Sequence, residues 1–264
     1  MKKNIFFILL AVACFGCGES KIEEAGFSTS AQQAEQDAGP IEGFRGDTLR
    51  LQTRPRNVLL TSDPAHRLVP IYKVNFHKRT KKPFVGSNSF YSSYWSYGRT
   101  DGNNWNNNFM PGFEAMYGYN FVNVSHYNNR TQQANAFFDK PVLIRTLYYP
   151  AFSKDTLNGT SITRQYYMVS AHDEDSNKDG FVNSKDLRRF YHFDLDANNK
   201  TPLVPQQYSV MSSEYDPQND YMYVFARLDE NANGQMESEE AISVFWIDLK
   251  DPSKKGMQYD GSQN

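Results

Sequence analysis

Short runs of β-type residues alternate with polar turn clusters along most of this chain. From Asn57 onward the runs are rich in Tyr, Phe, Val and Ile, and Asn, Asp, Gly and Pro separate them. No run shows the 3.6-residue period of an amphipathic helix, so the pattern predicts strands. The predicted strands are NVLLTSD, RLVPIYKVNF, MYGYNFVNVSHY, KPVLIRTLYYP, QYYMVSA, RRFYHFDL, YMYVFARL and ISVFWIDL. The chain is therefore expected to be almost wholly β.

Several predicted strands do not alternate cleanly between apolar and polar residues. The run YMYVFARL, for example, is apolar at successive positions. A strand with one face in water alternates, whereas a strand covered on both faces does not need to. We therefore expect such strands to be covered on both faces.

An internal repeat organises the C-terminal half. The segment beginning QYYMVSA aligns without a gap with the segment beginning DYMYVFA, so that Gly180 matches Gly234 and Asp186 matches Glu240 at an offset of 54 residues. Periods of this size are typical of repeated supersecondary units, propeller blades among them. Further steps of 54 reach MYGYNFVNVSHY and NVLLTSD, which predicts about four units. The expected fold is an all-β, β-propeller-like repeat domain, with a β-sandwich as the alternative.

The N-terminus has the pattern of an export signal. Two lysines precede an apolar run that is too short to span a membrane, and small residues then lead to Cys14 and Cys17. This arrangement resembles the lipobox of bacterial lipoproteins, in which the cysteine becomes the acylated first residue. Cys17 is the expected lipidation site because the polar sequence begins there, and Cys14 is the alternative. A plain signal peptide with an incidental cysteine is the simpler interpretation.

These features divide the chain into three parts. Residues 1–17 are expected to be the lipoprotein signal peptide. Residues 18–45 have few large apolar residues and no periodicity, which predicts a flexible tether. Residues 46–264 are expected to form the β-repeat domain.

Composition narrows the range of functions. Aromatic residues make up 15 % of the chain, which favours strands. The two cysteines lie in the signal region, so an exported body has no disulfides to stabilise it. Without Lys2 and Lys3, 26 basic residues stand against 30 acidic ones, a formal charge of about −4. This balance does not indicate a nucleic-acid partner.

Two polar loops in register within the repeat match the calcium-loop pattern D-x-[DN]-x-[DN]-G with an acid at position 12. Turn formation alone explains Asp, Asn and Gly, but it does not require an acid six residues after the glycine. The sequence therefore predicts two Ca²⁺ sites. The expected ligands of the first loop are Asp175, Asn177, Asp179, the Phe181 carbonyl, Asn183 and Asp186. Those of the second loop are Asp229, Asn231, Asn233, the Gln235 carbonyl, Glu237 and Glu240.

The spacing has a physical reason. Calcium takes six to eight oxygens at about 2.3 to 2.6 Å, and alternate side chains of a tight loop point inward. Glycine at position 6 permits the sharp reversal, and the apolar residue at position 8, Val182 or Met236, is expected to pack under the loop. Asp186 is shorter than Glu240, so we expect the second site to bind more firmly. Strands flank both loops, which predicts an ion that stabilises a strand-loop-strand hairpin.

A second candidate site is the segment Phe90–Phe113. Tyr94, Trp95, Tyr97 and Trp105 lie among asparagines and serines, a chemistry suited to stacking on sugars or peptides. Packing of these aromatics within the domain is the more ordinary interpretation. The five histidines show no metal-ligand spacing, and no catalytic motif is present in the sequence.

The segment SSEYDPQNDYMYVFARL and the later ISVFWIDLKDP resemble the blade repeat of TolB-like (PD40-type) β-propellers. The loops resemble the calcium loops of dockerins and EF-hands. The resemblance covers about residues 166–259; the usual S-P-D-G turn is not intact, and the chain is short for a six-bladed ring.

Taken with the lipobox, the resemblance implies a calcium-binding lipoprotein on the bacterial cell envelope that faces the periplasm or the exterior. It is expected to act as a binding module for an envelope protein or glycan rather than as an enzyme. An envelope hydrolase with a dispersed active site is the alternative from another class.

Overall fold

The computed structural model describes residues 26–29, 51–76, 80–85, 88–91 and 110–263. Across these residues the regular secondary structure is almost entirely antiparallel β, as the sequence pattern predicts. All eight predicted strand segments contain strands, and the described helical structure is the short 3-10 turn η3 (Gly261–Gln263). No helix in the described ranges has the length and apolar character needed to cross a bilayer.

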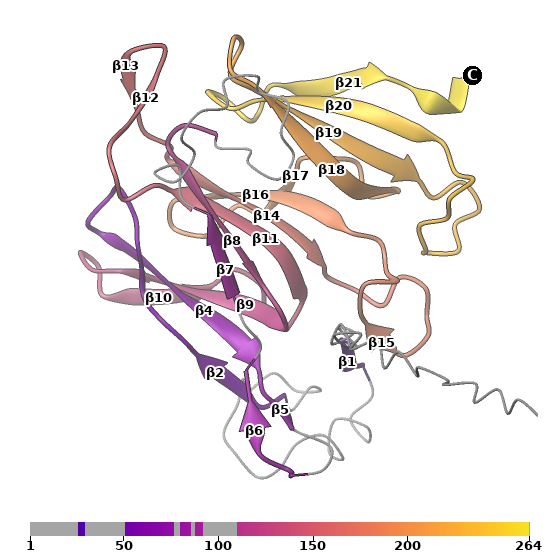
Figure 1. The fold of residues 1–264 in the computed structure, drawn as a ribbon, viewed down its shortest axis with the longest axis horizontal. Coiled ribbons are helices and arrows are strands. Elements are labelled where there is room, and N and C mark those ends of the chain that lie inside the picture. The colour runs from indigo at the N-terminus through magenta and orange to yellow at the C-terminus, as the bar shows by residue number, and fades with distance from the viewer. Residues whose placement is uncertain (1–25, 30–50, 77–79, 86–87, 92–109, 264) are drawn as a thin grey trace, which may run out of the picture.

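Three larger sheets make up the body of the molecule (Figure 1). The first sheet contains β2 (Thr53–Pro55), β3 (Leu59–Leu60), β4 (His66–Lys73), β9 (Phe121–Asn128) and β10 (Gln133–Ala136). The second contains β7 (Asn88–Tyr91), β8 (Phe113–Gly118), β11 (Leu143–Pro150), β14 (Tyr166–His172), β16 (Arg189–Asp194) and β17 (Thr201–Pro202). The third contains β18 (Tyr208–Asp216), β19 (Tyr221–Leu228), β20 (Ile242–Asp248) and β21 (Lys255–Tyr259).

Three two-stranded pairs complete the β structure. They are β1 (Phe27–Ser28) with β15 (Phe181–Val182), β5 (Asn75–Phe76) with β6 (Pro83–Phe84), and β12 (Asp155–Leu157) with β13 (Thr160–Ile162).

The second sheet lies between the other two and is covered on both faces. Along β14, Tyr167 and Val169 point into a core shared with the first sheet. The alternate residues Tyr166 and Met168 point into a second core shared with the third sheet. All seven residues of this strand are buried, which explains why QYYMVSA shows no polar alternation.

The third sheet does not follow the same expectation. Strand β19 alternates between buried and half-exposed positions, with Met222, Val224 and Ala226 buried and the residues between them less so. The prediction that YMYVFARL is covered on both faces is therefore wrong. The reason is its place at the end of the stack, where only one face meets another sheet (Figure 1).

The 54-residue repeat corresponds to two four-stranded meanders. The series β11-β14-β16-β17 and the series β18-β19-β20-β21 each run through neighbouring antiparallel strands. The N-terminal copies do not follow this plan, because β8 and β9, which both overlap MYGYNFVNVSHY, belong to different sheets. The chain thus crosses between the first and second sheets before the repeat begins. Closure of the sheets into a propeller remains a prediction.

A buried ion pair joins the two repeated sheets. Arg164, which precedes β14, donates two hydrogen bonds to the carboxylate of Asp220 at 2.7 and 2.9 Å. The two side chains are 2 % and 1 % exposed. Arg164 also binds the Leu249 carbonyl, and the hydroxyl of Tyr215 donates to Asp220. Because the charges and the remaining lone pairs are satisfied, the pair fixes how the repeats meet.

Part of the predicted tether is ordered. Phe27 is 2 % exposed and packs with Leu143 and Val182 in a small third core. Strand β1 pairs with β15, and Lys73 donates a hydrogen bond to the Gly26 carbonyl at 2.8 Å. The prediction of a flexible segment is therefore wrong for residues 26–29. The remainder of residues 18–45 lies outside the described residues, as do the signal segment 1–17 and both cysteines.

Candidate metal centre

The two predicted calcium loops lie at equivalent places in the repeated sheets. The first connects β14 to β16, and the second connects β19 to β20. Each loop therefore belongs to a strand-loop-strand hairpin, as the flanking sequences predict.

The side chains at positions 1, 3 and 5 accept the same backbone hydrogen bonds in both loops. The carboxylate of Asp175 accepts from the N–H groups at positions 5 and 6 at 3.0 and 2.9 Å, and Asp229 does so at 3.0 and 3.0 Å. Asn177 and Asn231 both accept from the N–H group at position 5. The position-5 side chains accept from the N–H group at position 7 at 2.9 and 2.8 Å. The two loops thus direct the same oxygens inward.

The backbone has the same shape in both loops. Position 4 is left-handed in each, with φ of 60° at Lys178 and 55° at Ala232. Position 6 is also left-handed, with φ of 88° at Gly180 and 75° at Gly234. Left-handed glycine at position 6 is what the reversal of a calcium loop requires, because other residues are strained there.

The loops differ at position 12, where the closing acid sits. The carboxylate of Asp186 is fully used within the protein, since one oxygen accepts from the Asn183 N–H at 2.8 Å and the other faces the Asn177 N–H and the Ser176 hydroxyl, each at 3.3 Å. Burial raises the pKa of Asp186, whereas these hydrogen bonds lower it.

Glu240 has a free oxygen. Its Oε2 accepts from the Glu237 N–H at 2.9 Å, but its Oε1 is buried and has no hydrogen-bond partner among the described residues. A buried carboxylate oxygen without a donor is costly unless a cation satisfies it. The ligand set of the second loop therefore fits a hard cation better than that of the first.

The two loops also contact each other. The Ser176 hydroxyl donates to the Gly234 carbonyl at 2.6 Å, and Asp186 forms an isolated antiparallel bridge with Gln235. A Cβ atom at Gly234 would overlap the Ser176 carbonyl, so only glycine allows this approach. Arg227 of β19 binds the carbonyls of Glu237, Ser238 and Glu240, which fixes the second half of loop two.

Some details of the predicted site do not hold. Val182 is 4 % exposed and packs under its loop as expected, but Met236 at the same position is 47 % exposed. The reason is that Val182 meets Phe27, whereas Met236 faces solvent. The three carboxylates of either loop do not form a tight cluster within the described ranges. Amide groups lie among them, with Asn231 donating to Glu237 at 2.8 Å.

The other predicted site residues are not part of this arrangement. Tyr94, Trp95, Tyr97 and Trp105 lie outside the described residues, so the proposed stacking surface stays a prediction.

A second group of possible metal ligands, which the spacing along the sequence does not reveal, lies outside the two loops. His66, His126 and Asp196 approach one another closely, although 60 and 70 residues separate them along the chain. The statement that the histidines show no metal-ligand spacing concerned the sequence alone, and the proximity of these three residues arises only in the fold. The available sequence signal was weak: His126 occurs in a predicted strand, and His66 directly precedes another.

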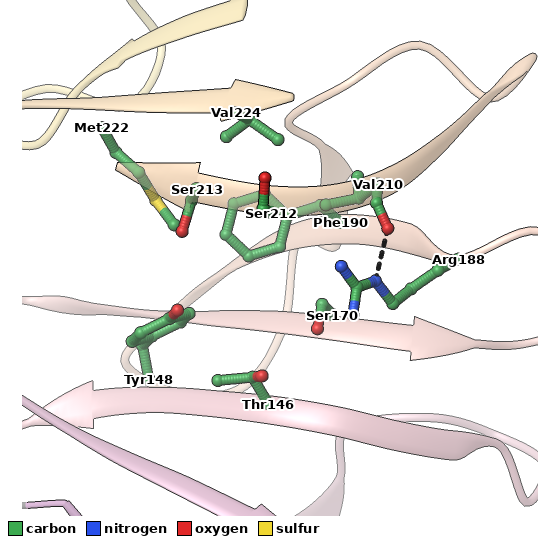
Figure 2. A pocket seen from close by; sticks show the side chains of 10 residues that line it. All are labelled: Thr146, Tyr148, Ser170, Arg188, Phe190, Val210, Ser212, Ser213, Met222 and Val224. Atoms are coloured by element: carbon green, nitrogen blue, oxygen red, sulfur yellow. Dashed lines mark hydrogen bonds between the residues drawn. The ribbon is translucent and has the colours of Figure 1, made fainter. Parts of the chain in front are cut away.

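Two cavities add to the picture of the described surface. A notch of about 20 Å³ lies between the second and third sheets. Arg188 lines it beside Ser170 and donates a hydrogen bond to the Val210 carbonyl (Figure 2). A volume of this size holds about one water molecule. A larger, mainly apolar cavity of about 480 Å³ lies between the β17–β18 connection and β21, with Lys255 as its one charged side chain. The residues that line these two cavities include no carboxylate and no histidine.

A scan of protein-family models and a search of curated proteins found no match to this chain.

Proposed function

We propose that this chain is a calcium-binding, lipid-anchored protein of the bacterial cell envelope, and that it acts as a binding or interaction module. Calcium stabilises the paired hairpin loops in this proposal, and Cys17 holds the domain at the membrane. The partner is an envelope protein or a glycan.

The observation that carries the proposal is the matching arrangement of the two loops. Turn-forming residues alone do not require the same side-chain oxygens, the same left-handed positions and an acid at position 12 in both copies. A calcium loop combines inward oxygens, a reversal at glycine and a closing acid, because the ion needs several oxygens around one point.

The ion would supply positive charge to a loop that carries three acidic side chains. Without it, the negative charges of Asp229, Glu237 and Glu240 have no cation to balance them, and we expect the hairpin to loosen. The unpaired Oε1 of Glu240 supports the view that the second site binds more firmly than the first.

The loop pair also links the ion sites to the N-terminal segment. Thr29 donates two hydrogen bonds to the carbonyl of Gly180 in loop one, at 2.8 Å from its N–H group and at 3.0 Å from its hydroxyl. If the domain is anchored through Cys17, only residues 18–25 separate the anchor from the segment that binds loop one. This supports a module that presents its surface near the membrane.

Thermal unfolding of the full chain tests the proposal. Calcium is expected to raise the melting temperature relative to chelator, and the double variant Asp229→Ala with Glu240→Ala is expected to lose most of that gain. The double variant Glu239→Ala with Asp251→Ala is the charge-matched control, because it removes two acids outside the loop's ligand positions. Identical wild-type melting curves in calcium and in chelator would contradict the proposal.

The anchor needs a separate measurement. Expression of the Cys17→Ala variant in a bacterial host is expected to release the protein from the membrane fraction, while Cys14→Ala leaves it bound. Release by the Cys14 variant alone would place the anchor at the alternative cysteine.

A further inference from the structure

Two histidines and one aspartate meet where the first and second sheets are stacked. His66 is the first residue of β4, and His126 lies on the neighbouring strand β9. The two residues are diagonal neighbours, because Leu68, two residues after His66, is the cross-strand partner of His126. Both side chains lie on the buried face of the first sheet, with relative exposures of 6 % and 1 %. Asp196 comes from the turn after β16 in the second sheet, so the group joins the two sheets.

The distances between the polar atoms are short. His66 Nδ1 lies 2.8 Å from His126 Nε2, and Asp196 Oδ1 lies 3.9 Å from the same His66 nitrogen. One potential ligand atom from each residue falls within 4.8 Å of the others, which within the described ranges is true of no other such group.

The other nitrogen of His66 faces an acid. Asp63 Oδ2 lies 3.8 Å from His66 Nε2. Asp63 is itself fixed, since its Oδ1 accepts from the Ala65 N–H at 2.8 Å and from Arg130 at 3.1 Å. A carboxylate on the far side of an imidazole is the usual outer partner of a metal-bound histidine, because it holds the ring orientation and the tautomer.

His126 has a ring nitrogen without a hydrogen-bond partner. Its Nδ1 is buried and makes no hydrogen bond of normal geometry with a described residue. Two neutral imidazoles carry two protons, and the contact between the rings takes one of them. The proton on one outer nitrogen is therefore missing, which leaves either His66 Nε2 without a proton to offer Asp63 or His126 Nδ1 as an unpaired acceptor.

We propose that His66 Nδ1, His126 Nε2 and a carboxylate oxygen of Asp196 bind a divalent transition-metal ion of the Zn²⁺ type. The ion takes the place of the proton between the rings. Each ring then keeps its proton on the outer nitrogen, where His66 faces Asp63 and His126 faces the Leu195 carbonyl.

The donor set selects the kind of metal. Imidazole nitrogens suit zinc and other late first-row metals, whereas calcium prefers oxygen, so this site is distinct from the calcium loops. Tetrahedral zinc with ligands at about 2.0 to 2.1 Å separates two nitrogens by about 3.3 Å. The rings must therefore move apart by about half an ångström. Asp196 is exposed and lies in a turn, so its side chain can approach the ion. The fourth coordination position of the ion is then open to solvent.

Calorimetric titration of the full chain with Zn²⁺ tests the site, with calcium present at saturation so that the loops are filled. One binding event per chain is expected. Asp196→Asn is expected to weaken it by at least about tenfold, and Asp63→Asn by about 10- to 100-fold. His192→Gln is the matched control, because it removes a half-buried histidine of the second sheet outside the cluster. Co²⁺ in place of Zn²⁺ is expected to give visible absorption bands that are typical of a tetrahedral centre.

The outcomes separate a metal site from a structural histidine pair. Zn²⁺ should raise the melting temperature of the wild type and of His192→Gln but not that of His126→Gln. If His126→Gln fails to fold, the exposed Asp196→Asn carries the test. Equal Zn²⁺ affinity in wild type and Asp196→Asn, or no saturable binding by the wild type, overturns the proposal. Since calcium is present throughout, the result does not depend on whether the loops bind it.

Discussion

Replacement of Glu240 by Gln should remove most of the stability that calcium confers. The change keeps the acceptor that Glu237 N–H needs, since one side-chain oxygen remains. It replaces the unpaired carboxylate oxygen by an amide that cannot bind a cation. The variant should therefore fold normally in chelator.

The magnitude follows from linkage. At a calcium concentration one hundred times the dissociation constant, a single site stabilises the fold by about 2.7 kcal/mol. Loss of one charge and one oxygen is expected to weaken binding by about a hundredfold, which leaves about 0.4 kcal/mol at the same concentration. The difference of about 2.3 kcal/mol corresponds to a fall of about 5 to 9 °C in the calcium-bound melting temperature.

Calorimetric melts in calcium and in chelator measure this effect, with Glu239→Gln as the control one residue away. Asp186→Asn provides the contrast, because both oxygens of Asp186 already accept hydrogen bonds. That variant should lose about 1 to 3 kcal/mol even in chelator, since a buried donor is left without its acceptor. A wild-type calcium response in Glu240→Gln, together with a lost response in Asp186→Asn, would refute the assignment of the firmer site to loop two.

Three further predictions concern stability. Gly180→Ala should lower the free energy of unfolding by about 1 to 2 kcal/mol, because alanine is strained in a left-handed backbone. Gly234→Ala should lower it more, because the added Cβ would overlap the other loop. Urea unfolding measures both changes. Asp220→Asn should cost about 3 to 5 kcal/mol in the same assay, because it leaves a buried guanidinium without its anion. Burial and the nearby Arg188 lower the pKa of His172 to about 3, so stability should be complete above pH 6.5 and fall by about 2 kcal/mol by pH 5, as only the unfolded chain takes up a proton.

Each of these has its own control. An equal loss of stability in the two glycine variants would mean that the two loops do not contact each other in solution. A cost below about 1 kcal/mol for Asp220→Asn would show that the ion pair is open to water. For the pH dependence, His172→Gln measured in chelator should flatten the curve between pH 5 and pH 6.5. A variant curve parallel to that of the wild type would assign the effect to other groups.

The sequence alone was sufficient for the features that depend on near neighbours. The strands follow from runs of β-branched and aromatic residues. The shape of the two loops follows from the spacing of Asp, Asn and Gly, because the hydrogen bonds at positions 1, 3 and 5 join residues no more than five apart. The expectation from the lengths of Asp186 and Glu240 that the second site binds calcium more firmly stays a prediction.

Tertiary structure decided what depends on sheet stacking and register. Val182 and Met236 occupy the same loop position, yet only Val182 is buried, because Phe27 arrives from a distant part of the chain. Strand β19 looks like β14 in sequence but has one open face, because its sheet ends the stack. No local pattern encodes either outcome.

The histidine cluster shows the same division most clearly. His66 and His126 lie 60 residues apart, and Asp196 comes from another sheet, so their spacing along the chain carries no signal. Their proximity results from the pairing register of β4 with β9 and from the packing of the first sheet on the second. The chemistry of a residue follows from its type, but which other residues it contacts depends on how the sheets align.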